Sequence, residues 1–115
     1  MKSSTAPTLF DLRGRTALIT GSTRGIGLAL AQGLAESGAS VILNSRQTSA
    51  VDAAVAQLQA LGLNAQGAAF DVADQASVEA AFAGFDRAGL AIDIVINNAG
   101  IQHRQPMLEI GRAHV

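Results

Sequence analysis

The chain has 115 residues, 49% of them hydrophobic and only 15% charged, which suits a single domain whose sheet is covered on both faces. Its net charge of -1 argues against a surface for nucleic acid, and the absence of cysteine excludes disulfides, thiolate metal sites and thiol catalysis. Because the polar start lacks an apolar signal core and no stretch of about 18 apolar residues occurs, we expect a cytoplasmic protein with no membrane partner.

The first expected strand and helix are joined by a glycine-rich turn. Residues 16–20 form a compact apolar run, the pattern of a strand buried on both faces. A helix follows, because apolar residues recur every fourth position, and Gly38 stands where a left-handed turn would end it. The residues that we expect on its core-facing stripe are Ile26, Leu30 and Leu34, with Ala31 and Ala35 beside them.

A second strand and helix come next. Residues 41–43 are an apolar run that predicts the strand. The helix is expected from Ser49 to Leu61, because Ser49 precedes Asp52 by three residues and Gly62 follows the last turn. Its expected core-facing stripe is Val51, Val55 and Leu58.

The third and fourth expected strands flank a third helix. The segment from Ala65 to Val72 predicts a strand, although Gly67 and two alanines dilute its β-propensity. Asp74 is expected to cap the helix that follows. The core-facing residues of that helix are expected to be Val78, Phe82 and Phe85. The fourth strand, Ile92 to Ile96, ends at the sequence Asn97-Asn98-Ala99-Gly100.

Strands and helices therefore alternate along the chain with short connections. Right-handed crossovers between such elements produce a parallel sheet with helices on both faces. We predict an α/β fold with a Rossmann-type doubly wound parallel sheet, its four strands in the order 3-2-1-4. The fourth strand would then lie at an edge of the sheet.

The turn after the first strand has the glycine spacing of a dinucleotide-binding loop. Gly21 allows a tight turn, Gly25 lets the backbone approach a pyrophosphate, and Gly27 lets the helix pack closely. Free N–H groups at the helix start would bind the phosphates. A glycine-rich turn without a ligand is the alternative, whereas a kinase-like P-loop is excluded because no Gly-Lys-Ser or Gly-Lys-Thr follows. The residues of this expected phosphate site are Gly21, Ser22, Thr23, Arg24, Gly25, Ile26 and Gly27.

Two motifs together resemble the short-chain dehydrogenase/reductase family. They are Thr-Gly-x-x-x-Gly-x-Gly at residues 20–27 and Asn-Asn-Ala-Gly at residues 97–100, and the resemblance extends from about Phe10 to Leu108. It implies hydride transfer between a nicotinamide cofactor and an alcohol or ketone, and hence a small-molecule substrate. It also implies that the full-length form is a homo-oligomer.

The end of the second strand favours NADP over NAD. An NAD-preferring site places Asp or Glu about 20 residues past the glycine loop to bind the ribose 2′-hydroxyl, and here that position is Ser45. Asn44, Ser45 and Arg46 offer no carboxylate that would repel a 2′-phosphate, while Arg46 and Arg24 can pair with it. The alternative, NAD binding with both arginines as solvated surface residues, stays open.

The resemblance also assigns residues at the ends of the third and fourth strands. It implies that Asp71, followed by Val72, contacts the adenine amino group, with a plain turn aspartate as the alternative. It implies that Asn97, Ala99 and Gly100 run under the ribose and nicotinamide, and that Asn97 ties neighbouring strands together. A simple turn is the alternative for this segment.

The catalytic residues of the family have no counterpart in this chain. Members use a tyrosine for the proton, a lysine that lowers its pKa and a serine that polarises the substrate oxygen. The chain has no tyrosine, and its one lysine, Lys2, precedes the first strand. We therefore assign no catalytic residue and no metal ligand, and expect the tyrosine and lysine to lie past Val115 and the chain itself to be inactive.

The last six residues look foreign to the domain. Ile110-Gly111-Arg112-Ala113-His114-Val115 can be back-translated into a widely used sequencing adapter. We therefore expect residues 1–109 to be a truncated cofactor-binding domain and residues 110–115 to be a non-native tail.

Within the family, the stretch from Asp11 to Arg46 and especially residues 100–108 resemble members that interconvert gluconate and 5-ketogluconate. His103 and Arg104 can meet a sugar-acid carboxylate, with a basic surface loop as the alternative. Another polyol or sugar acid, a 3-oxoacyl thioester and a steroid-like alcohol stay open as substrates. A non-catalytic NADP-binding sensor is a further alternative, which the sequence beyond Val115 would distinguish from an enzyme.

Overall fold

A computed structural model describes residues 11–99, in which four strands alternate with three helices. The elements are β1 (Thr16–Thr20), α1 (Gly25–Glu36), β2 (Ser40–Ser45), α2 (Thr48–Ala60), β3 (Ala65–Ala69), α3 (Gln75–Arg87) and β4 (Ile94–Asn97). The type and order of every element expected from the sequence are confirmed.

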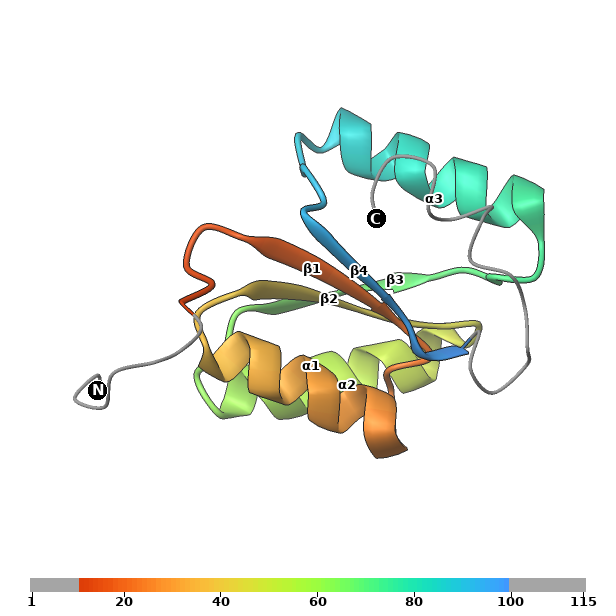
Figure 1. Cartoon of the computed structure of the whole chain (residues 1–115). Helices are drawn as coiled ribbons and strands as arrows, with labels where there is room; N and C mark the ends of the chain where they lie inside the picture. The colour runs from red at the N-terminus through yellow and green to blue at the C-terminus, as the bar shows by residue number, and fades with distance from the viewer. Residues whose placement is uncertain (1–10, 100–115) are drawn as a thin grey trace.

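The strands form one parallel sheet in the order β3-β2-β1-β4, as predicted. In the register of the sheet, Leu18 of β1 lies opposite Ile42 of β2 on one side and Val95 of β4 on the other. Figure 1 shows α1 and α2 on one face of the sheet and α3 on the other, which is the doubly wound arrangement. All four carboxyl ends therefore meet at the same edge, where the connecting turns can share a ligand.

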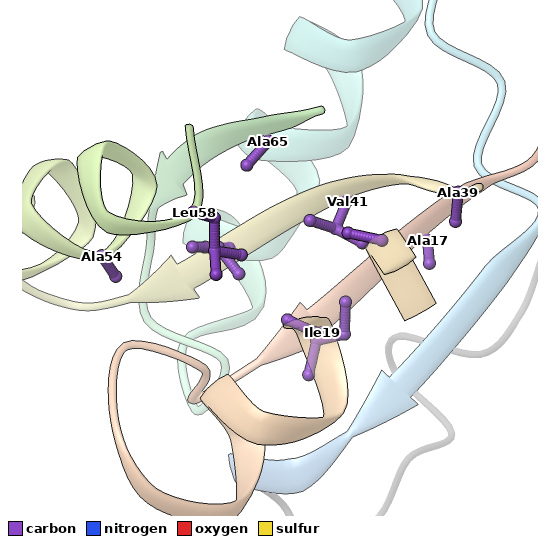
Figure 2. Close-up of a cluster of buried hydrophobic side chains, with 10 residues drawn as sticks. Ala17, Ile19, Ala39, Val41, Ala54, Leu58 and Ala65 are labelled. Carbon is purple, nitrogen blue, oxygen red and sulfur yellow. The ribbon is translucent and has the colours of Figure 1, made fainter. Parts of the chain in front are cut away.

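Side chains alternate between two hydrophobic cores because successive residues of a strand point to opposite faces. The core beneath α1 and α2, part of which is drawn in Figure 2, consists of Ala17, Ile19, Ala31, Ala35, Ala39, Val41, Leu43, Ala54, Leu58 and Ala65. The core beneath α3 consists of Leu18, Ile42, Phe70, Val78 and Phe85. Each fully buried leucine or isoleucine contributes roughly 1.5–3 kcal/mol relative to exposure, so β1 and β2 anchor the domain.

The core-facing side of α1 differs from the expected stripe. The buried residues are Gly27, Ala31 and Ala35, whereas Ile26 is 72% and Leu30 is 39% exposed. Small side chains at this spacing let the helix lie close to the sheet, and the larger side chains are then displaced to its flanks. The expectation that Ile26 and Leu30 face the core was therefore wrong.

Several element boundaries also differ from those expected, among them the start of β4, which is Ile94 rather than Ile92. The cap of α2 is Gln47 rather than Ser49, because the Ser45 hydroxyl accepts a 3.1 Å hydrogen bond from the Gln47 main-chain N–H and turns the chain earlier. The strand β3 ends at Ala69 rather than at Val72. It ends there because the main-chain N–H of Asp71 donates to Ser77 Oγ of α3, at 3.0 Å, instead of to a strand.

Gly67 has a packing role that its low β-propensity conceals. A β carbon at this residue would overlap Cγ1 of Val51 and lie 3.1 Å from Cγ2 of Val55. The bare backbone of β3 thus allows α2 to lie directly against the sheet.

Candidate functional site

A cavity of about 590 Å³ lies at the carboxyl ends of the strands. It is next to the point where the strand order reverses, between β1 and β4, which is where open α/β sheets bind their ligands. Its lining comes from the segments that follow all four strands, from the end of β2 itself and from the starts of α1 and α2. The lining residues are Gly21, Thr23, Arg24, Gly25, Asn44, Ser45, Arg46, Gln47, Ala50, Phe70, Asp71, Val72, Ala73 and Ala99.

The turn from β1 into α1 forms one wall of the cavity. Gly21 and Gly25 have φ values of 59° and 61°, in the left-handed region that favours glycine. The residue before the helix, Arg24, is extended and makes no side-chain hydrogen bond to the first turn. The Arg24 side chain thus does not cap the first N–H groups of α1. These groups lie beside the cavity, together with the positive end of the helix dipole.

Gly27 fixes the helix start against the turn. A β carbon on Gly27 would overlap the Gly21 carbonyl oxygen and would lie 2.7 Å from Nδ2 of Asn98. The close helix packing expected for this glycine is therefore observed. Gly27 itself is buried and does not line the cavity.

Ser22 and Asn44 hold the turn from beneath. The Ser22 hydroxyl is fully buried; it donates to the Ile19 carbonyl oxygen at 2.6 Å and accepts from the Asn44 main-chain N–H at 2.9 Å. The Asn44 side chain, 1% exposed, accepts a hydrogen bond from the main-chain N–H of Gly21 at 3.1 Å. Both residues were expected to bind the cofactor, and both direct their polar groups to the protein itself.

The two arginines expected at the 2′-phosphate are available to a ligand. Arg24 and Arg46 are exposed, line the cavity, and form no ion pair with any residue between 11 and 99. Ser45 lies beside them, but its hydroxyl is occupied by the main chain of Gln47. Two cationic residues therefore line the cavity, Arg24 after β1 and Arg46 after β2.

Asp71 forms a turn and also faces the cavity. Its Oδ1 accepts from the main-chain N–H of Ala73 at 2.9 Å, which is an Asx turn. Asp71 and Val72 line the cavity at the end next to β3, the edge strand of the sheet, with Phe70 beside them. The turn expected as an alternative is thus present, and Oδ2 of Asp71 makes no hydrogen bond to any residue between 11 and 99.

Three hydrogen bonds tie the end of β4 and the segment after it to the end of β1 and the glycine turn. The Thr20 hydroxyl donates to Oδ1 of Asn97 at 3.0 Å and accepts from the Ala99 main-chain N–H at 3.2 Å. Asn98, 3% exposed, donates from Nδ2 to the Gly21 carbonyl oxygen at 2.8 Å. Asn97 therefore joins β4 to β1 as expected.

Sequence reasoning overlooked several residues of this region. Asn98 was not singled out, although it stands inside the Asn-Asn-Ala-Gly motif, and that motif was the signal that could have found it. The cavity-lining residues that were not expected are Gln47, Ala50, Phe70 and Ala73.

Some expected site residues do not line the cavity, and others lie outside the described part of the chain. Ser22, Ile26, Gly27 and Asn97 are described but are not among the lining residues. Gly100, His103, Arg104 and the tail at residues 110–115 lie outside residues 11–99.

The chemistry of the cavity suits an anionic ligand. It combines main-chain N–H groups at a helix start, two guanidinium groups and a single carboxylate, Asp71. Within residues 11–99, no group of three or more His, Cys, Asp or Glu side chains could hold a metal ion. No helix in that range is both long enough and apolar enough to cross a membrane.

Comparison with known proteins gives consistent matches. The sequence model of the short chain dehydrogenase family matches residues 15–115. Gluconate 5-dehydrogenase of Gluconobacter oxydans (strain 621H) is 51% identical over 106 residues, which are 92% of this chain and 41% of the relative. 2-Dehydro-3-deoxy-D-gluconate 5-dehydrogenase of Formosa agariphila is 43% identical over 103 residues, which are 89% of this chain and 39% of the relative. The chain thus spans about two-fifths of the length of these curated relatives.

A solved structure matches both the fold and the sequence. It is the crystal structure of a gluconate 5-dehydrogenase from Burkholderia cenocepacia J2315 in complex with NADP and tartrate, with a TM-score of 0.75 and 49% sequence identity. The match covers 79% of this chain and 36% of that one.

Proposed function

The chain belongs to the short chain dehydrogenase family, and we propose that it is the cofactor-binding part of an NADP-dependent oxidoreductase. The reaction would move a hydride between NADP(H) and an alcohol or ketone. The observation that carries the proposal is the cavity at the point where the strand order reverses. One wall of this cavity is the start of α1, whose first N–H groups are not capped by the Arg24 side chain.

The residues present fit a dinucleotide. The pyrophosphate would bind the N–H groups that follow Gly25, because a β carbon on Gly25 would meet no atom within 4 Å apart from its chain neighbours and its own helix backbone. A side chain there would occupy the space that the phosphates need. Gly21 and Gly27 hold this wall in place from behind.

The arginines support NADP rather than NAD. A 2′-phosphate carries a charge of about -1.5 to -2, and Arg24 and Arg46 face the cavity without carboxylate partners among residues 11–99. The residue in the position of the NAD-binding acid is Ser45, which cannot repel a phosphate. The relative from Burkholderia cenocepacia, which was solved in complex with NADP, is consistent with this choice.

The remaining site residues divide between the two ends of the cofactor. Asp71 would accept a hydrogen bond from the adenine amino group, with Val72 beside it. Ala99 and the expected Gly100 would lie under the ribose and nicotinamide. The bound cofactor would supply or accept the hydride at its nicotinamide ring, and this chain's residues would bind it and orient it.

No residue of this chain is proposed to handle the proton. The sequence contains no tyrosine, and its one lysine, Lys2, precedes β1. The proposed substrate of the whole protein is gluconate or 5-ketogluconate, because the relatives from Gluconobacter oxydans and Burkholderia cenocepacia are both named gluconate 5-dehydrogenase. Among the expected residues, His103 and Arg104 would meet the sugar-acid carboxylate.

The test is a comparison of NADP+ and NAD+ binding by calorimetry, with the unmodified chain and two charge-reversal variants. Arg46→Asp should weaken NADP+ roughly 10- to 100-fold, because charge-assisted hydrogen bonds are lost, and NAD+ much less. Arg87→Asp, at the end of α3 and outside the cavity lining, is the matched control and should change neither affinity. Equal NADP+ affinity for the unmodified chain and Arg46→Asp would refute the 2′-phosphate assignment.

A further inference from the structure

We propose that Asn44 is a positioning residue that joins the phosphate end of the cavity to its adenine end. It would set the affinity for the nucleotide without setting the choice between NADP and NAD. This inference rests on the proposed function, because it concerns the same cavity.

The Asn44 side chain contacts two turns at once. Oδ1 accepts from the Gly21 main-chain N–H at 3.1 Å, which fixes the residue where the phosphate turn begins. Nδ2 donates to the carbonyl oxygens of Ala68 and Phe70, each at 3.1 Å, at the end of β3. One amide thus holds the carboxyl ends of β1 and β3, from its own place on β2 between them.

The main chain of Asn44 adds two more contacts to the same turn. Its N–H donates to Ser22 Oγ at 2.9 Å, and its carbonyl oxygen accepts from the Ser22 main-chain N–H at 2.8 Å. Gly21 and Ser22 are therefore both fixed by one residue that is 1% exposed.

These partners dictate the chemistry of residue 44. The Gly21 N–H requires an acceptor at Oδ1, and the carbonyl oxygens of Ala68 and Phe70 require two N–H donors at Nδ2. Only a primary amide on a side chain of this length satisfies all three partners. Aspartate has the same shape, but a carboxylate would face the two carbonyl oxygens without a proton to donate. The requirement is thus for both functions of an amide rather than for a polar side chain in general.

The two residues that follow have different surroundings. The Ser45 hydroxyl binds the main chain of Gln47, and Arg46 is exposed beside the cavity. Arg46 can reach the one group that distinguishes NADP from NAD, whereas Asn44 supports the turns that bind the parts common to both. Substitution of Asn44 should therefore weaken both nucleotides equally, and substitution of Arg46 should change their ratio.

The experiment compares Asn44→Ala with Arg46→Ala in the full chain, and measures dissociation constants for NADP+ and NAD+ alongside thermal unfolding. Asn44→Ala should weaken NADP+ and NAD+ by the same factor, about tenfold, and leave their ratio unchanged. Arg46→Ala should weaken NADP+ alone. A changed ratio or unchanged affinities for Asn44→Ala would overturn the positioning role.

A second variant covers the case in which Asn44→Ala does not fold. Asn44→Asp keeps the acceptor for Gly21 and loses both donors to β3, so it should keep the Gly21 amide protected from hydrogen exchange. It should bind 2′,5′-ADP, the adenine half of NADP, about tenfold more weakly than the unmodified chain, and pyrophosphate equally well. Unchanged 2′,5′-ADP affinity, or failure of both variants to fold, would overturn the proposal. If the unmodified chain binds neither nucleotide, the proposed function is wrong, and the inference that rests on it is wrong as well.

Discussion

The carbonyl oxygen of Gly21 lies so close to the α carbon of Gly27 that a β carbon at residue 27 would overlap it. The same β carbon would lie 2.9 Å from Cα of Ser22, so two of its three nearest neighbours are backbone atoms, which cannot move aside as a flexible side chain can. The contact fixes the first turn of α1 against the turn that precedes it. The direction of the first N–H groups of the helix depends on this contact.

Gly27→Ala should therefore damage the phosphate turn. We expect the free energy of unfolding to fall by about 1–3 kcal/mol, as for other overpacked sites, and nucleotide affinity to fall with it. The matched control is Gly33→Ala in the same helix, where nothing lies within 4 Å of the added carbon. That variant should gain about 0.5–1 kcal/mol because alanine is the better helix former. Urea unfolding measures both, and equal stability of the two variants would contradict this account of Gly27.

The fold could be predicted because its signals are local. The apolar run at residues 16–20 and the glycines after the helices can each be recognised without knowledge of the rest of the chain. Every element type that they predicted was confirmed. The face of α1 was not predictable from hydrophobicity alone. Ile26 is more apolar than Gly27, yet Gly27 is buried, because the distance between helix and sheet decides which side chain fits.

The site was only partly predictable, because sequence spacing indicates which residues gather and not what each one contacts. Arg24, Arg46 and Asp71 were expected at one site, and all three line the cavity. Asn98 and Gly21 are 77 residues apart, and no local sequence pattern predicts the hydrogen bond between them. The inward direction of the Ser22 hydroxyl depends likewise on the neighbouring strand. That these residues bind a cofactor stays a prediction.

The start of α3 offers a test of helix capping. The Asp74 side chain accepts from the main-chain N–H groups of Ala76 and Ser77 at 3.0 and 3.4 Å, as the sequence predicted. Asp74→Ala should lower the free energy of unfolding by about 1 kcal/mol. Gln47→Ala is the control, because Gln47 precedes α2 and makes no capping hydrogen bond, so its effect should stay within about 0.5 kcal/mol. Chemical unfolding compares them, and a larger loss for Gln47→Ala would contradict the capping role.

The pair of Asp11 and Arg13 predicts a small dependence of stability on acid. Hydrogen bonds from the Arg13 side chain, followed by one from its main chain, lower the pKa of Asp11 from 3.8 to about 2. A carboxyl with a lowered pKa stabilises the folded state above its unfolded pKa and loses that effect as pH falls through the folded one. The stability difference between the unmodified chain and Asp11→Asn should hold above about pH 4, shrink as pH falls towards about 2, and vanish below that pH. Because both side chains are in water, added salt should shrink the stability difference, and a difference that stays undiminished between about pH 4 and about pH 2 would argue against the pair.

The two carboxylate oxygens of Asp71 have different roles, so substitutions can test the turn and the proposed adenine contact separately. One oxygen, Oδ1, accepts from the Ala73 main-chain N–H at 2.9 Å, so the other is the one that would accept from an adenine amino group. Asp71→Asn keeps an oxygen for the turn but presents an NH₂ group to the ligand, where two donors would face each other. Stability should stay unchanged while 2′,5′-ADP binding weakens about tenfold, whereas Asp71→Ala should lose both. Nicotinamide mononucleotide, which lacks adenine, should bind all three proteins alike when followed by NMR titration. If Asp71→Asn bound 2′,5′-ADP as tightly as the unmodified chain, Asp71 would be a turn residue and nothing more.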